Sequence, residues 1–107
     1  MKLYRTVSKA ERDDYIHTGE LRTAKNTLEG KQFFKSEIAV REFMSNSKLQ
    51  RYSPPYKYLF ILDIDEECLG SIDYDEQELD RFEAITIFEA DLPQFNNCIN
   101  FIEQNVI

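Results

Sequence analysis

Two periods of alternation between hydrophobic and polar residues run along this chain, and together they predict a mixture of strands and helices. Short apolar runs rich in aromatic and branched side chains, bounded by charged or turn-forming residues, are typical of strands inside a sheet. Such runs occupy residues 2–7, 58–63 and 84–88, and a shorter aromatic run, Gln32-Phe33-Phe34, lies between the first two. We expect the three longer runs to share one sheet.

Capping residues and helical spacing predict a first helix over residues 8–18. Ser8 is suited to be its N-cap, and Glu11, three residues later, completes a capping box. Gly19 fits the left-handed backbone position that follows the last turn of a helix. The apolar face of this helix would consist of Ala10, Tyr15 and Ile16.

Two further helices are expected over residues 36–45 and 92–104. Ser36 is the candidate N-cap of the first, which should end at the polar sequence Ser45-Asn46-Ser47. The second has apolar residues at the spacing of one helix face, namely Leu92, Phe95, Cys98, Ile99 and Ile102. Each helix has an apolar stripe that needs cover, so we expect all three to pack against the sheet.

The segments between these elements are polar or acidic. Residues 24–30 and 48–57 contain turn-forming residues and are expected to be irregular. The acidic stretch from Asp73 to Asp80 should face solvent and be mobile, and could act as a lid over a cleft on the sheet. We therefore predict one α+β domain over residues 1–107, with a small mixed or antiparallel sheet and three helices.

Charge is distributed unevenly along the 107 residues, whose formal net charge is −7. Residues 1–62 contain 12 Lys and Arg against 7 Asp and Glu, whereas residues 63–107 contain one Arg against 13 acidic residues. An acidic chain is a poor non-specific binder of nucleic acid, because such binding depends on neutralising phosphates. A basic cleft made by the first half could hold a small anionic ligand, or its Lys and Arg residues could simply solvate helix faces.

Neither cysteine pairing nor metal binding is expected from the sequence. Cys68 and Cys98 lie far apart and form no CxxC pair, and no signal-like apolar run follows Met1. We therefore expect buried or free thiols in a reducing compartment, with the protein in the cytoplasm. The longest apolar run, residues 58–62, is too short to cross a bilayer, so no membrane partner is expected. The acidic run after Asp63 lacks the glycine that a calcium loop requires.

Several short motifs in the first 45 residues form a recognisable series. They are Tyr4-Arg5, Ser8 to Glu11, Thr18-Gly19 and, above all, Leu-Glu-Gly-Lys-Gln-Phe-Phe-Lys-Ser at residues 28–36, followed by Ala39. This series resembles the start of ADP-ribosyltransferase-fold domains, in particular those at the C-termini of bacterial polymorphic toxins of the rearrangement-hotspot type. A weaker similarity covers residues 84–96. The resemblance implies an ADP-ribosyltransferase-like α+β fold with NAD as the substrate.

The resemblance also implies roles for individual residues toward NAD. Arg5 would hold the ribose or the phosphates, a role that suits the fixed fork of donors of a guanidinium. Phe34, with Phe33 beside it, would stack on the nicotinamide ring, and Ser36 would shape the nicotinamide pocket at the strand end. Each residue has an ordinary structural alternative: Arg5 paired with a carboxylate, one phenylalanine facing the core, and Ser36 capping a helix.

A late glutamate would assist cleavage of the glycosidic bond by stabilising positive charge as nicotinamide leaves. Glu83, just before the strand at residues 84–88, is the predicted catalytic acid, and Glu89, at the far end of that strand, is its rival. An acid that flanks a strand is also commonly just solvated.

Two functional hypotheses from different classes remain. The first is an NAD-binding, ADP-ribosyltransferase-like domain that transfers ADP-ribose to a protein acceptor or hydrolyses NAD, or that keeps the fold without the activity. The second is a non-catalytic acidic binding or adaptor protein, phage- or toxin-associated, that engages a basic protein partner. The feature that separates them is an acid placed opposite Arg5 in one cleft.

Overall fold

The structure is a computed structural model that describes residues 1–22, 30–50, 58–79 and 81–106. Its elements in chain order are β1 (Lys2–Val7), α1 (Lys9–Thr18), β2 (Gly30–Phe34), α2 (Glu37–Gln50), β3 (Tyr58–Ile64), α3 (Glu66–Leu69), β4 (Asp75–Leu79), β5 (Phe82–Phe88), the 3-10 turn η1 (Glu89–Asp91), α4 (Leu92–Asn97) and β6 (Ile99–Val106). They form a single α+β unit. Of the segments expected to be irregular, 24–30 and 48–57, residues 24–29 and 51–57 lie outside the described residues. Gly30 belongs instead to β2, and residues 48–50 belong to α2.

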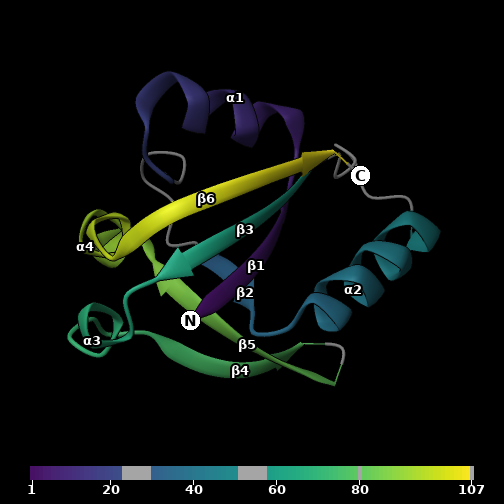
Figure 1. Ribbon diagram of the computed structural model, residues 1–107. Helices are drawn as coiled ribbons and strands as arrows, with labels where there is room; N and C mark the ends of the chain where they lie inside the picture. Colours follow the sequence, from purple (N-terminus) through teal and green to yellow (C-terminus); the bar gives the residue numbers. More distant parts are fainter. Residues whose placement is uncertain (23–29, 51–57, 80, 107) are drawn as a thin grey trace.

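One antiparallel sheet contains all six of these strands, in the order β4-β5-β2-β1-β3-β6. The first strand in the sequence, β1, therefore lies in the middle of the sheet, between β2 and β3 (Figure 1). The β1–β3 pairing runs from Lys2 opposite Asp63 to Val7 opposite Tyr58. The prediction that residues 2–7, 58–63 and 84–88 share a sheet is confirmed.

The two faces of the sheet carry separate cores, because successive side chains of a strand point to opposite sides. The core shared with α3 and α4 includes Leu3, Phe33, Phe60, Leu62, Ile85 and Ile87. The smaller core shared with α2 consists of Phe34, Ala39, Val40, Leu59 and Ala84. Figure 1 shows α2 well apart from α1 and α4, in agreement with this division.

Helix α1 has the predicted caps but not the predicted apolar face. The Ser8 hydroxyl accepts the Glu11 N–H at 3.3 Å, and Gly19 takes the left-handed conformation with φ of 76°. None of the residues of α1 is buried, and Ile16 is 53% exposed. Only Tyr15 packs on the larger core, with its ring edge against Phe60. The helix is also held to the sheet by the ion pairs of Glu11 with Arg5 and Lys31 and by Arg12, which lies over the Tyr58 ring.

Helix α2 begins where the sequence predicts and continues further. The Ser36 hydroxyl accepts the Ala39 N–H at 3.1 Å, which confirms Ser36 as a capping residue. The helix does not end at Ser45 but extends to Gln50. Weak helix formers near residue 46 do not end it, because propensity is a small effect of less than about 1 kcal/mol per residue.

The third predicted helix is wrong beyond residue 97. Helix α4 ends at Asn97, and the chain then forms β6, which pairs with β3 from Ile64 opposite Ile99 to Tyr58 opposite Val106. This pairing supplies hydrogen bonds to the edge of an otherwise bare apolar strand. The spacing of Ile99 and Ile102, interpreted as one helix face, belongs instead to a strand.

The acidic stretch forms an edge strand rather than a mobile lid. Strand β4 pairs with β5 from Asp75 opposite Thr86 to Leu79 opposite Phe82. Asp75, Glu76 and Glu78 are exposed, as expected. The backbone pairing fixes residues 75–79 on the sheet, because a lid would have to break that ladder to move. Asp80 lies outside the described residues.

The two cysteines form a disulfide, so the expectation of free thiols is wrong. The Sγ atoms of Cys68 and Cys98 are 1.98 Å apart. The bond joins α3 to the residue between α4 and β6, and Cys98 is fully buried. Disulfides persist mainly in oxidising compartments, so the cysteines do not support the expected reducing one. Within the described ranges, no helix has the length and apolar character needed to cross a membrane.

Candidate functional site

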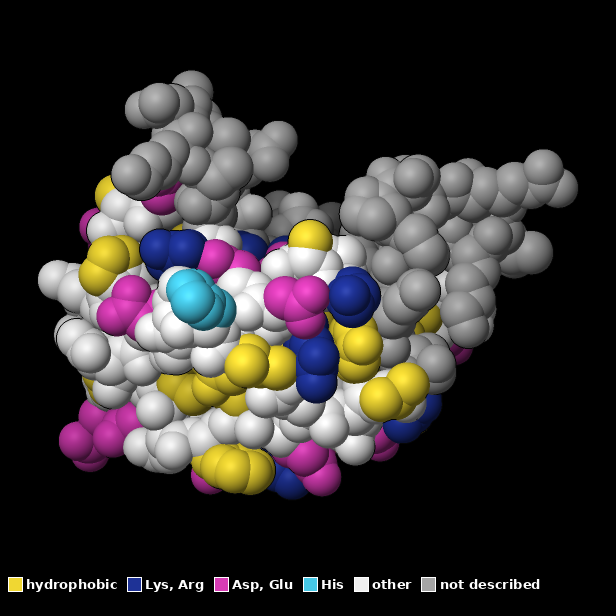
Figure 2. Space-filling view, turned by 90° about the horizontal axis from the view of Figure 1, so that it is seen from above, with side chains coloured by type: hydrophobic (Ala, Val, Ile, Leu, Met, Phe, Trp, Pro, Cys, Tyr) yellow, Lys and Arg dark blue, Asp and Glu magenta, His cyan; other side chains and the backbone are white. Residues whose placement is uncertain are grey.

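A cavity of about 800 Å³ lies beside α1, bounded by β1, the start of β2, and the η1–α4 segment. Its charged lining includes Arg5, Glu11, Asp14, Arg22, Lys31 and Glu89. Figure 2 looks onto the α1 side of the molecule, where basic and acidic side chains lie next to one another. The walls of the cavity therefore carry both signs of charge, beside apolar side chains such as Leu21 and Leu92.

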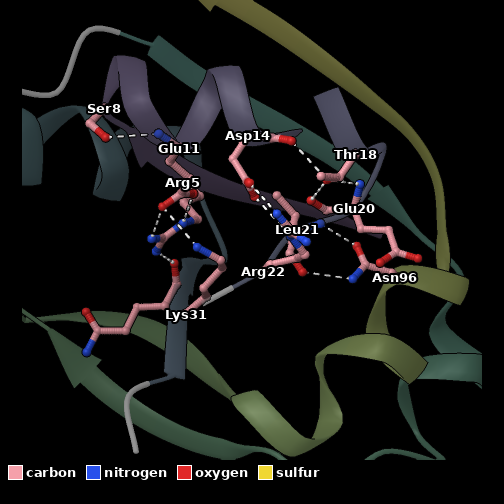
Figure 3. Close-up of polar contacts among 11 residues, drawn as sticks. Arg5, Ser8, Glu11, Asp14, Thr18, Glu20, Leu21, Arg22, Lys31 and Asn96 are labelled. Carbon is pink, nitrogen blue, oxygen red and sulfur yellow. Dashed lines mark hydrogen bonds and ion pairs between the residues drawn. The ribbon is translucent and has the colours of Figure 1, made fainter. Parts of the chain in front are cut away.

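Three charged side chains meet at the inner wall of this cavity, from β1, α1 and β2 (Figure 3). Arg5 donates from Nε to Glu11 Oε2 and from Nη2 to Glu11 Oε1, both at 2.7 Å, and from Nη1 to the Gln32 carbonyl at 3.0 Å. Lys31 Nζ lies 3.1 Å from the same Glu11 Oε1. We call Arg5, Glu11 and Lys31 the triad. Lys31 is only 5% exposed.

Burial and mutual charge shift the pKa values of two triad members. Burial raises the pKa of Glu11, but the hydrogen bonds and charges of Arg5 and Lys31 together outweigh it and hold that pKa below its ordinary value. Burial, followed by the charge of Arg5, lowers the pKa of Lys31, and Glu11 and Asp14 oppose this only in part. Glu11 is thus stabilised as a carboxylate, whereas the Lys31 ammonium is incompletely compensated.

An exposed ion pair lies at the outer part of the cavity. Arg22 donates to both carboxylate oxygens of Asp14, with distances of 2.6 Å from Nη2 and 3.3 Å from Nε. The hydrogen bond from Arg22 lowers the pKa of Asp14 below its ordinary value. Because both side chains are exposed, the pair contributes little to stability. Glu20 also lines the cavity near this pair, so this part of the wall is not electrically neutral.

The opposite wall is fixed by Asn96 of α4. Its side-chain oxygen accepts the Leu21 N–H at 2.9 Å, and its side-chain nitrogen donates to the Leu21 and Leu92 carbonyls at 2.9 and 3.0 Å. One amide side chain thereby ties α4 to the segment that follows α1, as Figure 3 shows for Leu21. The contact sets the separation of the two walls.

The pairing of β2 with β5 explains why Glu89 borders the cavity near the triad. Gly30 lies opposite Phe88 and Lys31 opposite Ile87, so Glu89 follows directly on the residue that faces Gly30. A Cβ atom at Gly30 would lie 2.7 Å from the Ile87 carbonyl oxygen and would clash with it. Glycine has no Cβ atom and so avoids this clash. Glycine at this position therefore lets the two strands approach closely at the cavity edge.

The structure divides the predicted site residues between the two faces of the sheet. Arg5 lies on the cavity side, with its guanidinium carbon 5.7 Å from the centre of the Phe33 ring. Phe34 lies on the other face, packed against Phe43 of α2, and Ser36 caps that helix. The predicted grouping of Arg5 with Phe34 and Ser36 in one pocket is therefore wrong, because adjacent strand residues point to opposite sides.

The two candidate acids are also separated. Glu83 is exposed and lies opposite Glu78 of β4, outside the cavity lining, whereas the half-buried Glu89 lines the cavity together with Arg5. Of the two, Glu89 is the acid that shares a cleft with Arg5. Within the described residues, no group of three or more His, Cys, Asp or Glu side chains could hold a metal ion.

Sequence reasoning missed Lys31 and the ion-pairing role of Glu11. A signal for Lys31 was present, because it lies two residues before Phe33 and so shares that residue's face of the strand. Glu11 was interpreted only as part of the capping box. No pattern in the neighbouring sequence predicted its contacts with Arg5 of β1 and Lys31 of β2. No family model, no curated protein and no solved structure matches the chain. The site must therefore be interpreted from its own geometry.

Proposed function

We propose that this domain binds NAD in the cavity and acts as an ADP-ribosyltransferase or NAD glycohydrolase, with Glu89 as its acidic residue. The observation that carries the proposal is that Arg5 and Glu89 line one cavity. An acid in the same cleft as Arg5 is what distinguishes this enzyme class from a passive binding module. The volume of about 800 Å³ is within the range of ordinary ligand sites.

The charge arrangement of the cavity suits a ligand that is anionic in one part and cationic in another. The triad supplies two cations for the diphosphate, and Glu89 supplies a carboxylate for the positively charged nicotinamide riboside end. Leu21, Leu92 and Pro93 provide apolar lining for a flat ring, in place of the role first given to Phe34.

The chemistry required of Glu89 is stabilisation of developing positive charge. When the bond between the ribose carbon and the nicotinamide nitrogen breaks, its electron pair leaves with nicotinamide and the ribose becomes oxocarbenium-like. A nearby carboxylate stabilises this cation, and it can accept a proton from the water or acceptor group that then attacks the same carbon. Glu89→Gln keeps the shape of the side chain and removes both capacities.

The test is calorimetry with NAD together with a nicotinamide-release assay. We expect wild-type protein to bind NAD, and Glu89→Gln to bind it nearly as well while losing turnover by roughly 100-fold or more. Glu83→Gln is the matched control, since it removes an exposed acid near the other end of β5, and it should behave as wild type. Loss of turnover in Glu83→Gln but not in Glu89→Gln would refute the assignment, and no NAD binding by the wild type would refute the function.

A non-catalytic role is the second candidate, and one observation favours it. The edge strand β4 presents the exposed acidic residues Asp75, Glu76 and Glu78, next to an unpaired backbone edge among the described residues. Such an edge suits an extended basic segment of a protein partner. Failure of NAD to bind would favour this alternative.

A further inference from the structure

The triad contains more positive than negative charge. Arg5 and Lys31 each carry one positive charge, and Glu11 carries one negative charge, so the described group has a net charge of about +1. The side chains of these residues are 19%, 6% and 18% exposed for Arg5, Lys31 and Glu11. The nearby Asp14 is already paired with Arg22 and so compensates this charge only weakly. Glu20 and Glu89 also line the cavity, so the excess positive charge belongs to the triad and not to the cavity as a whole.

The N–H donors of Arg5 and Lys31 differ in how many partners they have within the described residues. Among the described residues, Arg5 directs three of its N–H groups to Glu11 and Gln32, while the ammonium of Lys31 has Glu11 as its ion-pair partner. Glu11 in turn accepts two hydrogen bonds from Arg5 and forms an ion pair with Lys31. Arg5 is therefore already held by three hydrogen bonds, whereas Lys31 has a single ion-pair partner. Of the two cations, Lys31 is the one whose charge is less compensated when an anion enters the cavity.

We propose that Lys31 is the main anchor for a diphosphate group in this cavity, and that Glu11 is the internal counter-anion that holds Arg5 and Lys31 side by side. This inference rests on the cavity assigned in the proposed function, and it requires only binding, not turnover. Diphosphate is favoured over a single carboxylate because it has several anionic oxygens for two adjacent cations. Burial lowers the pKa of Lys31. An anion also attracts a buried ammonium group more strongly than it would in water, because the surroundings are less polar.

The test uses ADP and inorganic pyrophosphate as ligands in calorimetry at low ionic strength. Lys31→Met keeps the apolar stem but removes the charge, and should weaken ADP binding roughly tenfold or more. Lys35→Met is the matched control: Lys35 follows β2, pairs with Glu76 at 2.9 Å and lies outside the cavity lining. It should leave the affinity unchanged. Equal losses in the two variants would overturn the proposal.

Glu11→Gln tests the role of the counter-anion. Gln cannot hold both cations by charge, so Arg5 and Lys31 should lose their fixed arrangement, and ADP should bind severalfold more weakly in a protein that keeps a cooperative thermal transition. Unchanged or tighter binding in that folded variant would overturn the role given to Glu11. Should Lys31→Met not fold, wild-type ADP affinity measured from neutral to alkaline pH replaces it. It should fall as Lys31 loses its proton, and a flat profile would count against the proposal.

The outcomes separate this inference from the proposed function. Lys31-dependent binding of ADP without nicotinamide release from NAD would retain the diphosphate anchor and refute the enzyme. Nicotinamide release that is unaffected by Lys31→Met would retain the enzyme and refute the anchor. Binding of pyrophosphate alone, with no binding of ADP, would restrict the site to inorganic anions and refute a nucleotide ligand.

Discussion

At the scale of single residues, Glu11 connects helix α1 to two strands of the sheet. Its carboxylate bonds Arg5 of β1 and Lys31 of β2, while its own backbone belongs to α1. No residue of α1 is buried, so this contact adds to the packing of Tyr15 on Phe60 in fixing the helix on the sheet. The position of α1, and hence one wall of the cavity, depends in part on the charge of Glu11.

The lowered pKa of Glu11 predicts a loss of stability in acid. Because that pKa is lower in the folded than in the unfolded chain, ionised Glu11 stabilises the fold above its unfolded pKa of about 4.3. This stabilisation is lost as the pH falls through the folded pKa. Urea denaturation should therefore show a steeper loss of free energy of unfolding below about pH 5 in the wild type than in Glu11→Gln.

A suitable control for that experiment is Asp13→Asn. Asp13 lies two residues further along α1, and its side chain is 50% exposed in pairs with Lys9 and Arg12. Its variant should keep the acid dependence of the wild type. The interpretation fails if Glu11→Gln and Asp13→Asn have the same pH profile.

At the scale of elements, the β4–β5 hairpin has a two-residue connection, because Leu79 lies opposite Phe82. Arg81 in this connection has φ of 73°, a left-handed conformation that costs a non-glycine residue roughly 1 kcal/mol. Glycine adopts this conformation without penalty, and Asp-Gly is a favoured sequence for such turns. The hairpin therefore contains a local conflict between residue type and backbone.

Replacing Arg81 by glycine should relieve this conflict. We expect Arg81→Gly to raise the free energy of unfolding by about 0.5–1 kcal/mol, visible as a higher midpoint in thermal denaturation. Arg81→Ala removes the same charge but keeps the Cβ atom, and should give no comparable gain. A rise of equal size in both variants would mean that charge, rather than backbone conformation, limits stability here.

At the scale of the whole molecule, apolar runs and caps predicted β1, β2, β3, β5 and the starts of α1 and α2, but not β4, β6 or how the faces divide. Phe33 and Phe34 are equally apolar, and only the pairing of β2 decides which one faces the cavity. By spacing alone, residues 99–102 fit either a helix or a strand. They form part of strand β6 because this segment pairs with the edge of β3. These choices depend on contacts between distant segments, which local patterns do not contain.

The candidate site was predicted in the same partial way. Arg5 was predicted to bind the ligand and lines the cavity, whereas Glu83 was preferred to Glu89 from the sequence and lies outside the cavity lining. The reverse ranking follows from η1, which places Glu89 beside the edge of β2. The pairing of Cys68 with Cys98 was likewise hidden, since 30 residues separate them and they meet only through the fold.

The disulfide should contribute substantially to the stability of the whole domain. Closing a loop of 30 residues is worth about 3–4 kcal/mol in the chain-entropy description. A reducing agent should therefore lower the melting temperature of the wild type, while leaving a Cys68→Ala, Cys98→Ala double variant unaffected. Free-thiol titration of the unfolded, unreduced protein should find no reactive thiol, and two reactive thiols there would contradict the bond.

The central position of β1 has a consequence for how the chain reaches its fold. This strand is made first, yet its partner β3 lies more than fifty residues away at Val7 opposite Tyr58, and further at Lys2 opposite Asp63. The chain between the two strands must lose conformational entropy to bring them together, before their contacts can stabilise the pairing. We therefore expect acquisition of the native state in roughly milliseconds to seconds, slower than for helical domains of this size. Until then, the newly synthesised chain leaves apolar strands without partners, which makes this stage the most prone to aggregation.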